Sequence, residues 1–343
     1  MDVDRDRLNR LPRWAVVAVV APPAIFLALF YVWPLTTLLA RALDGTTITD
    51  TLTRAATWKV LWFTFWQAVA STGATLLIGL APSWAVARWS FPGRSVLVSV
   101  LTAVFVLPTV VVGAAFVAVL PDGIDRSIWA ILGAHIAFNL AVVVRTVGAV
   151  WERLPRDMEA AAATLGASPL RVFTTVTLPL LRPALAAAGA IVFLFTFSSF
   201  GVIRVLGTAG QRTIEVEVWR RATQLGDIGG AAVLSVVQLA VLGVVVAVSA
   251  GWQRRHAAAF TAPAGMRRPT PSGRQRWAVG ASAGIAAVIV VVPLIALVER
   301  SLRRDGSYSL DAWRNLGNTE IRPGLRLGVD PIAALQASVT TAI

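Results

Sequence analysis

The sequence contains no cysteine, two histidines and a single lysine, Lys59. Without cysteine the chain cannot form a disulfide bond, an iron–sulfur cluster or a thiolate metal site, and two histidines supply too few ligands for a typical zinc centre. A phosphate-binding loop of the form GxxxxGK[ST] needs a lysine after its glycines, and Lys59 has no such glycines before it. The chain is therefore not expected to bind ATP through such a loop, or to hold a metal or another cofactor.

Charged residues are also scarce, at 14% of 343 residues, whereas 56% are hydrophobic and the mean hydropathy is +0.70. A water-soluble domain of this size is far less apolar. Seven stretches reach the roughly 20 apolar residues that a bilayer-spanning helix needs, and an eighth begins near Ile332. The seven stretches cover residues 14–40, 60–87, 96–120, 128–150, 184–206, 229–251 and 277–298. Because these runs are continuously apolar and do not alternate, they predict an all-α integral membrane protein and not a barrel.

Arginine supplies nearly all of the positive charge, and the net charge is +13. Such a charge raises nucleic acid as a partner, but the arginines lie between the apolar runs and not in one patch. Short loops rich in basic residues prefer the cytoplasm. Sixteen of the 31 basic residues lie in four segments that face the cytoplasm if the N-terminus is inside, namely 1–13, 88–95, 151–183 and 252–276. Six of the other 15 basic residues lie in the single segment 299–331. Outside that segment the distribution favours a cytoplasmic N-terminus, and the lack of one basic patch argues against a nucleic-acid partner.

Two parts of the chain resemble each other. LFYVWPLTTLLARAL (29–43) is similar to AVIVVVPLIALVERSL (287–302), since each is an apolar run with a proline near its end and an arginine just beyond. Gln67 in FWQAVASTGA matches Gln336 in LQASVTTAI. The tract 253–276 between the copies is rich in Pro, Gly and Arg, which predicts a linker. The second copy then stops where its first core helix begins, so we expect a piece of a longer two-unit chain or a truncated gene product.

The segment 158–183, MEAAAATLGASPLRVFTTVTLPLLRP, predicts two short helices. Residues 159–165 are strong helix formers, and Gly166 after them supplies the left-handed backbone of a turn. A second, amphipathic stretch follows, and Pro179 and Pro183 are expected to end it before the next span. An ordinary amphipathic loop on the membrane surface is the alternative. An exposed loop of two helices, by contrast, suits docking in a groove of another protein.

This segment resembles the signature loop of permease subunits of binding-protein-dependent ABC importers, E-A-A-x-x-x-G followed by F, an aliphatic residue and L-P. One position differs, because counting back from Gly166 puts the motif's Glu at Ala160, whereas Glu159 stands one residue earlier. Some members of the family have two consecutive Glu, of which Glu159 matches the first. The residues to which the resemblance assigns contact with the ATPase are Glu159, Ala160, Ala161, Gly166, Ser168, Pro169, Phe173, Val176, Leu178 and Pro179.

Further motifs are similar in order and spacing to the fused, two-unit permeases of the thiamine and iron(III) importers. They are FTFWQA (63–68), RWSFPGR (88–94), LGAHIAFN (132–139), FTFSSFGV (195–202) and QRTIEVEVWRRA (211–222). The resemblance implies a type I ABC importer permease (MetI-like) helix bundle in the inner (plasma) membrane, surrounded by lipid and without catalysis of its own. It also implies a dimer of separate ATPase subunits and an extracytoplasmic solute-binding protein. The residues leave open whether the solute is thiamine or iron(III).

The resemblance also implies how the chain is organised. Residues 1–54 would hold an N-terminal tail, the first transmembrane helix and an outer loop. A first permease transmembrane domain would follow at 55–252, with a coupling loop at 152–183. A cytoplasmic linker is expected at 253–276, and the start of a second permease unit at 277–343.

Polar residues in the predicted spans form two groups. His135 and Asn139 are four residues apart in the fourth span and so share one face of a helix, and Thr196, Ser198 and Ser199 lie in the fifth. Polar groups inside a bilayer face protein or a water-filled cavity. These five residues either line a transport pathway or form hydrogen bonds between helices, and the sequence leaves both open. The two groups are expected to meet near the middle of the bundle.

Two other functions are less consistent with the sequence. A secondary transporter driven by an ion gradient would need buried acidic residues, and the predicted spans contain no Asp or Glu. A membrane enzyme would need paired carboxylates, a Ser-His-acid set or a metal cluster in register on its helices, and the predicted helices carry none. The sequence therefore favours a permease subunit, with the secondary transporter as the alternative.

Overall fold

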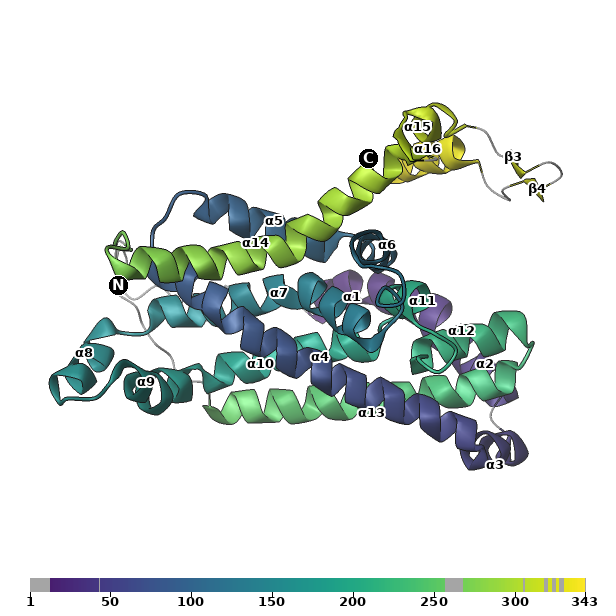
Figure 1. The fold of residues 1–343 in the computed structure, drawn as a ribbon. Helices are drawn as coiled ribbons and strands as arrows, with labels where there is room; N and C mark the ends of the chain where they lie inside the picture. Colours follow the sequence, from purple (N-terminus) through teal and green to yellow (C-terminus); the bar gives the residue numbers. More distant parts are fainter. Residues whose placement is uncertain are drawn as a thin grey trace. The chain divides into compact units, whose positions relative to one another are not determined.

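A computed structural model describes the chain in seven segments. They are residues 13–42, 44–256, 268–304, 306–317, 320–322, 325–326 and 330–342. Nearly all of the predicted N-terminal tail and the middle of the predicted linker lie outside these segments. The described residues are almost wholly helical (Figure 1). They form two compact units. Unit 1 comprises Met1–Trp66 and Arg212–Ala250, and unit 2 comprises Gln67–Gln211 and Gly251–Ile343.

Unit 1 begins with a long apolar helical run. The elements of this unit are α1 (Arg13–Leu27), the π-helical turn η1 (Ala28–Val32), α2 (Trp33–Ala42), α3 (Gly45–Thr53), the first part of α4 (Ala55–Arg88), α12 (Ile214–Gln224) and most of α13 (Ile228–His256). The most apolar window of the span Trp14–Thr37 contains no buried residue. A proline interrupts regular helical bonding, which accounts for the widened turn η1 just before Pro34.

An ion cluster joins the short helix α12 to its neighbours in unit 1. Glu217 is 4% exposed and lies 2.7 Å from Arg220, 3.2 Å from Arg221 and 3.7 Å from Arg212. Burial acts to raise the pKa of Glu217, but the hydrogen bonds and charges of these arginines hold it below its ordinary value. Arg221 also pairs with Asp227 at 3.2 Å. The carboxylate is therefore buried with its charge compensated, as a buried ion requires.

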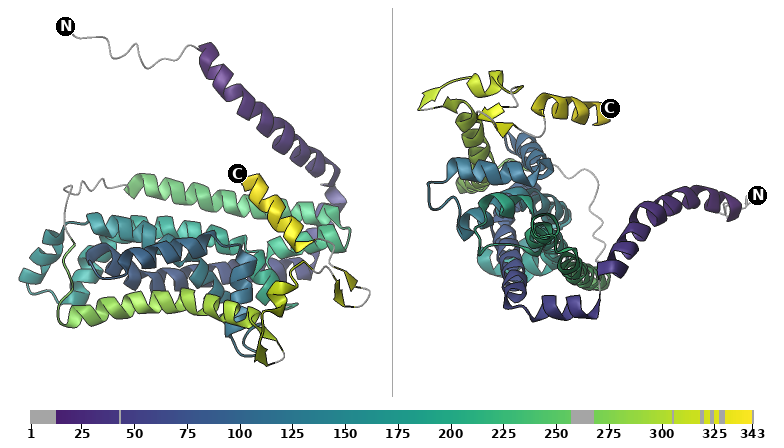
Figure 2. Two further views of the ribbon diagram at one scale, coloured as in Figure 1. Left: turned by 90° about the horizontal axis from the view of Figure 1, so that it is seen from above. Right: turned by 90° about the vertical axis from the view of Figure 1, so that its right-hand side faces the viewer.

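Unit 2 is built around α7 (Ile128–Arg153), two thirds of whose most apolar window is buried. The helices that pack against it are α5 (Arg94–Val106), α6 (Thr109–Val119), α10 (Leu178–Phe197), α11 (Gly201–Leu206) and α14 (Arg274–Ser301). The left view of Figure 2 shows α14 running along this group of helices. Side chains of α4, α7 and α10 share one apolar core, in which Val143, Leu181 and Val192 are fully buried. This core positions the loop that joins α7 to α10.

That loop contains α8 (Arg156–Thr164), α9 (Pro169–Val172) and the π-helical turn η2 (Phe173–Thr177). Figure 1 and the left view of Figure 2 both show α8 and α9 beyond the ends of α7 and α10. After α14 come short elements: β1 (Arg303–Arg304), β2 (Ser307–Tyr308), α15 (Asp311–Arg314), β3 (Glu320–Arg322), β4 (Leu325–Arg326) and α16 (Pro331–Ala342). The strands form two antiparallel hairpins, which the all-α prediction did not include.

Six helices of the described chain are long and apolar enough to cross a membrane, and the count is seven if a bent pair forms one span. That pair is α5 and α6, which are bent by 109°, so the predicted third span over 96–120 is not one continuous helix. Pro108 accounts for the break, because the residue before a proline avoids helical backbone and Leu107 is extended. The predicted eighth span corresponds to α16, which has 12 residues.

The bend also allows α11 to approach the start of α6. Gly201 has no side chain, and a Cβ placed there would lie 2.6 Å from the backbone nitrogen of Val110 and against Thr109. Any other residue would clash with backbone at this point, so the glycine in FTFSSFGV has a packing reason. The fifth predicted span, 184–206, is accordingly not one helix, since α10 ends at Phe197 and α11 begins at Gly201.

Pro179 and Pro183 do not end a helix, which corrects the sequence prediction. The helix from Pro169 continues through both prolines to Phe197 as a span of 29 residues. A proline lacks an N–H and its ring crowds the carbonyl four residues earlier, which for Pro179 is that of Thr175. Thr175 lies in η2, and a widened turn at this place accommodates the ring without ending the helix.

Candidate functional site

The loop between α7 and α10 has the predicted form of two helices around a glycine. Gly166 has φ +84°, the left-handed backbone that favours glycine. Two backbone hydrogen bonds close the end of α8. The N–H of Gly166 donates to the carbonyl of Ala163 at 2.9 Å, and the N–H of Ala167 donates to the carbonyl of Ala162 at 3.1 Å. Ser168 then caps α9, since its hydroxyl accepts from the backbone N–H of Arg171. The prediction of a turn at Gly166 is confirmed.

The outer surface of this loop is exposed and partly apolar. Five of the predicted contact residues are exposed, and they are Ala160, Ala161, Gly166, Ser168 and Pro169. Two leucines that the sequence reading missed stand out even more, Leu165 at 89% exposed and Leu170 at 72%. The available signal in the sequence was one leucine before and one after Gly166, in a loop that was expected to be exposed. Apolar groups gathered on an exposed surface mark contact sites.

The other predicted contact residues are less exposed. Phe173, Val176, Leu178 and Pro179 are half-buried. Glu159 is engaged within the chain, because its Oε1 accepts a hydrogen bond from the Thr177 hydroxyl at 2.8 Å and lies 2.9 Å from a guanidinium nitrogen of Arg88. The resemblance assigned Glu159 to an outside contact, and the sequence analysis did not find its internal contacts.

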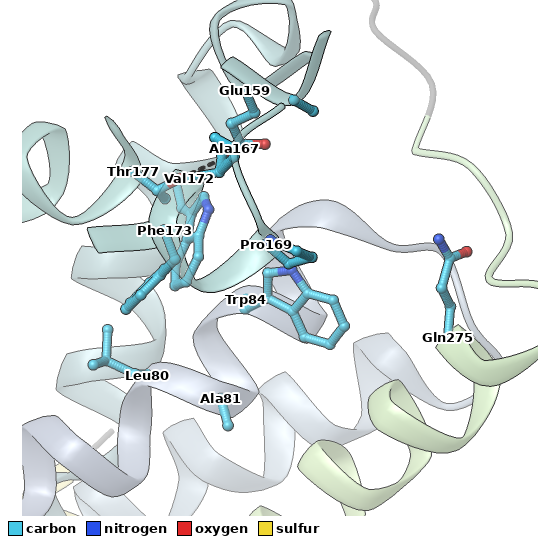
Figure 3. Close-up of a pocket in the computed structure, with 12 residues that line it drawn as sticks. Leu80, Ala81, Trp84, Glu159, Ala167, Pro169, Val172, Phe173, Thr177 and Gln275 are labelled. Atoms are coloured by element: carbon cyan, nitrogen blue, oxygen red, sulfur yellow. Dashed lines mark hydrogen bonds between the residues drawn. The ribbon is translucent and has the colours of Figure 1, made fainter. Parts of the chain in front are cut away.

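A pocket of about 760 Å³ opens on the inner side of the loop (Figure 3). Leu80 and Trp84 of α4, Phe173 of η2, Trp151 of α7 and Gln275 of α14 are among the residues that line it. The rings of Trp151 and Phe173 stack with centroids 6.1 Å apart. The loop is therefore supported from beneath by aromatic side chains of the bundle.

A second group of polar side chains is buried between the helices of unit 2. His135 is 2% exposed, with Nδ1 2.9 Å from the Ser71 hydroxyl and Nε2 2.9 Å from the Ser199 hydroxyl. The predicted meeting of the two polar groups is thus confirmed for His135 and Ser199. Ser71 was missed, although Gln67 and Ser71 stand four residues apart in the sequence, the spacing of one helix face. Through these two contacts the imidazole ring of His135 links α4, α7 and the segment after α10.

The remaining predicted pathway residues make mostly local bonds. Asn139 donates to the carbonyl of His135 at 2.9 Å, and its Oδ1 has no hydrogen-bond partner among the described residues. Thr196 and Ser198 donate to carbonyls one turn earlier in α10, at 2.8 and 2.7 Å. Gln67 donates to the carbonyl of Thr196 at 2.8 Å. The described residues contain no group of three or more His, Asp or Glu that could hold a metal ion.

A family model described as the inner membrane component of binding-protein-dependent transport systems matches residues 76–304. The chain belongs to this family. The matched region runs from α4 to the end of α14 and includes the loop with α8 and α9. The predicted membership among the permeases of binding-protein-dependent ABC importers is confirmed, and the chain is a multi-pass membrane protein.

Two relatives in this family have names that state a solute. The thiamine transport system permease protein ThiP of Salmonella typhimurium is 27% identical over 264 residues, which cover 72% of this chain and 49% of ThiP. A putative 2-aminoethylphosphonate transport system permease protein, PhnU of Salmonella choleraesuis, is 26% identical over 243 residues, 63% of this chain and 85% of PhnU. The chain thus spans about half the length of the thiamine permease.

The fold of this chain is also similar to that of a solved structure. A bacterial alginate ABC transporter, crystallised with an alginate pentasaccharide-bound periplasmic protein, matches with a TM-score of 0.56. The match covers 71% of this chain and 94% of the matched chain, at 16% sequence identity. The likeness supports the ABC importer permease fold that the sequence predicted.

Proposed function

We propose that this chain is a transmembrane permease subunit of an ATP-driven importer and that residues 152–183 form its coupling loop. The exposed two-helix turn at Gly166, in a chain of this family, carries the proposal. Leu165 and Leu170 form an apolar surface suited to a groove on an ATPase subunit. The N-terminus and the loop lie in the cytoplasm, a dimer of ATPase subunits binds there, and a solute-binding protein delivers the solute from outside.

We infer that the solute is thiamine. The support is ThiP, whose similarity covers most of this chain, together with the motifs shared with thiamine permeases. PhnU makes 2-aminoethylphosphonate the second candidate, while iron(III) has no support among the relatives named above. An ion-gradient transporter has none either. His135 and Ser199 serve to join helices in this proposal, because both ring nitrogens are occupied by hydroxyl groups of the same chain.

The position of the loop can be tested with a single cysteine, since the chain has none of its own. Leu165→Cys should be labelled by an impermeant maleimide only from the cytoplasmic side, and bound ATPase should protect it. Arg126→Cys, in the exposed connection between α6 and α7, is the matched control and should be labelled from outside only. Labelling of Leu165→Cys from outside would overturn the proposed orientation.

The solute can be tested in proteoliposomes that contain the assembled transporter, its ATPase and its binding protein. ATP-dependent uptake of radiolabelled thiamine is expected, and unlabelled thiamine should compete whereas 2-aminoethylphosphonate should not. The reverse pattern of competition would replace thiamine by the phosphonate. If neither thiamine nor 2-aminoethylphosphonate is taken up in an ATP-dependent way, both candidate solutes are contradicted.

A further inference from the structure

Arg88 stands at the last residue of α4, at the start of the motif RWSFPGR, and its side chain is buried. We propose that Arg88 is a positioning residue that fixes the coupling loop to α4 and α7, so that the loop and these helices move as one body. The inference rests on the proposed function of the loop and adds the residue through which the loop acts on the bundle.

The contacts of Arg88 reach two other elements of unit 2. One guanidinium nitrogen, Nη1, donates to the carbonyl of Leu154 at 2.9 Å, directly after α7. The other, Nη2, lies 2.9 Å from Oε1 of Glu159 in α8. The backbone carbonyl of Arg88 in turn accepts from the Arg156 side chain at 2.6 Å. A single residue thus connects the end of α4, the end of α7 and the first turns of α8.

Thr177 extends the connection to the far end of the loop. Its hydroxyl donates to the same Oε1 of Glu159, and Thr177 is 3% exposed at the end of η2. The loop is therefore fixed both where it leaves α7 and where it enters α10. If the loop moved alone, the guanidinium of Arg88 would be left buried without its carboxylate, which is costly. A displacement of the loop is accordingly transmitted to the helices.

The same helices are joined a second time at the buried histidine. Ser71 of α4, His135 of α7 and Ser199 after α10 are linked by hydrogen bonds. Ser71 and Arg88 are about 25 Å apart along α4, from a rise of 1.5 Å per residue. Two links at this separation resist relative rotation of the helices, whereas one link would act as a pivot. The helices and the loop then respond to ATP as a rigid body.

The geometry also explains why the residue is arginine. Its planar fork donates to the Leu154 carbonyl and faces the Glu159 carboxylate at the same time. A lysine carries a compact charge on a flexible stem and lacks this fixed fork. Arg88→Lys should therefore preserve the charge and folding but loosen the connection, while Arg88→Ala should remove it.

Rigid-body movement can be measured by the distance between two spin labels within unit 2. The labels are placed at Thr164→Cys, at the end of α8, and at Trp129→Cys, in the first turn of α7, where the side chain is 73% exposed. In the assembled transporter this distance should be the same without nucleotide and with ATP. In Arg88→Ala it should shift by several ångström or broaden on ATP binding, with a smaller change in Arg88→Lys. Arg153→Ala, an exposed arginine in the last turn of α7, next to Leu154, is the matched control.

Two results would overturn the proposal. One is a wild-type distance that itself changes with ATP, and the other is an Arg88→Ala distance that matches the wild type in both states. Co-purification of the ATPase, measured on the same samples, separates this inference from the proposed function. If Arg88→Ala behaves as wild type while the ATPase still binds the loop, the positioning role fails and the coupling loop stands. If Arg88→Ala does not fold, Arg88→Lys supplies the same comparison.

Discussion

Gly166→Val is expected to abolish stable association of the permease with its ATPase while leaving membrane insertion intact. A β-branched residue at φ +84° is strained by about 2 kcal/mol, which corresponds to about a thirtyfold smaller population of the native turn. Leu165 and Leu170 would then no longer be presented together. The measurement is the amount of ATPase that co-purifies with the variant, compared at equal permease content.

The chain offers a matched control for this variant. Gly123, between α6 and α7, also has a positive φ, +88°, and like Gly166 has open space where a Cβ would lie. Gly123→Val should carry similar backbone strain but retain the ATPase. Gly166→Asn should recover much of the association, because asparagine tolerates the left-handed region. Wild-type co-purification with Gly166→Val would mean that the turn conformation is not required for docking.

His135→Ala is expected to lower the free energy of unfolding by about 3 kcal/mol and to leave the apparent affinity for solute unchanged. The variant creates a cavity between helices and removes the hydrogen bonds that link Ser71 and Ser199 to the ring. Because both ring nitrogens are used inside the chain, no direct contact with solute is lost. The checks are the thermal unfolding of the purified transporter and the KM for uptake.

Ser198→Ala is the control for His135→Ala, because it removes a nearby polar group that does not link helices. The Ser198 hydroxyl bonds to the Leu194 carbonyl of its own helix, so Ser198→Ala should change stability by less than about 0.5 kcal/mol. His135→Gln keeps one hydrogen-bonding arm and should be intermediate. A raised KM in His135→Ala with unchanged stability would instead support a pathway role for the ring.

The sequence predicted the elements that depend on local pattern. Apolar runs marked the spans, and the helix formers before Gly166 marked the turn, because both signals are contained in neighbouring residues. The bend at Pro108 was missed although the proline was visible, since prolines within α10 are accommodated and the one at 108 is not. Whether a proline bends a helix depends on the packing around it, and that packing comes from distant parts of the chain.

The candidate site was predicted unevenly for the same reason. The loop was located, yet the resemblance to the signature loop assigned Glu159 to an outside contact, and no partner for it is visible in its own segment. Its partner, Arg88, is 71 residues away in the sequence. Ser71 and His135 are 64 residues apart. Pairs at such separations depend on how the helices pack, and a helix-by-helix reading of the chain does not contain that information.

The bend between α5 and α6 has a consequence for what surrounds the bundle. A helix that ends inside the apolar layer leaves its last carbonyls without intrahelical partners, and hydrocarbon tails offer no donors to replace them. Such a backbone break is stable only where another protein surface or water covers it. Val106, beside the bend, is 76% exposed in the single chain. Gly201 of α11 covers the bend at Thr109 and Val110, and on the exposed side, at Val106, we expect a second subunit or an aqueous space in the assembled transporter.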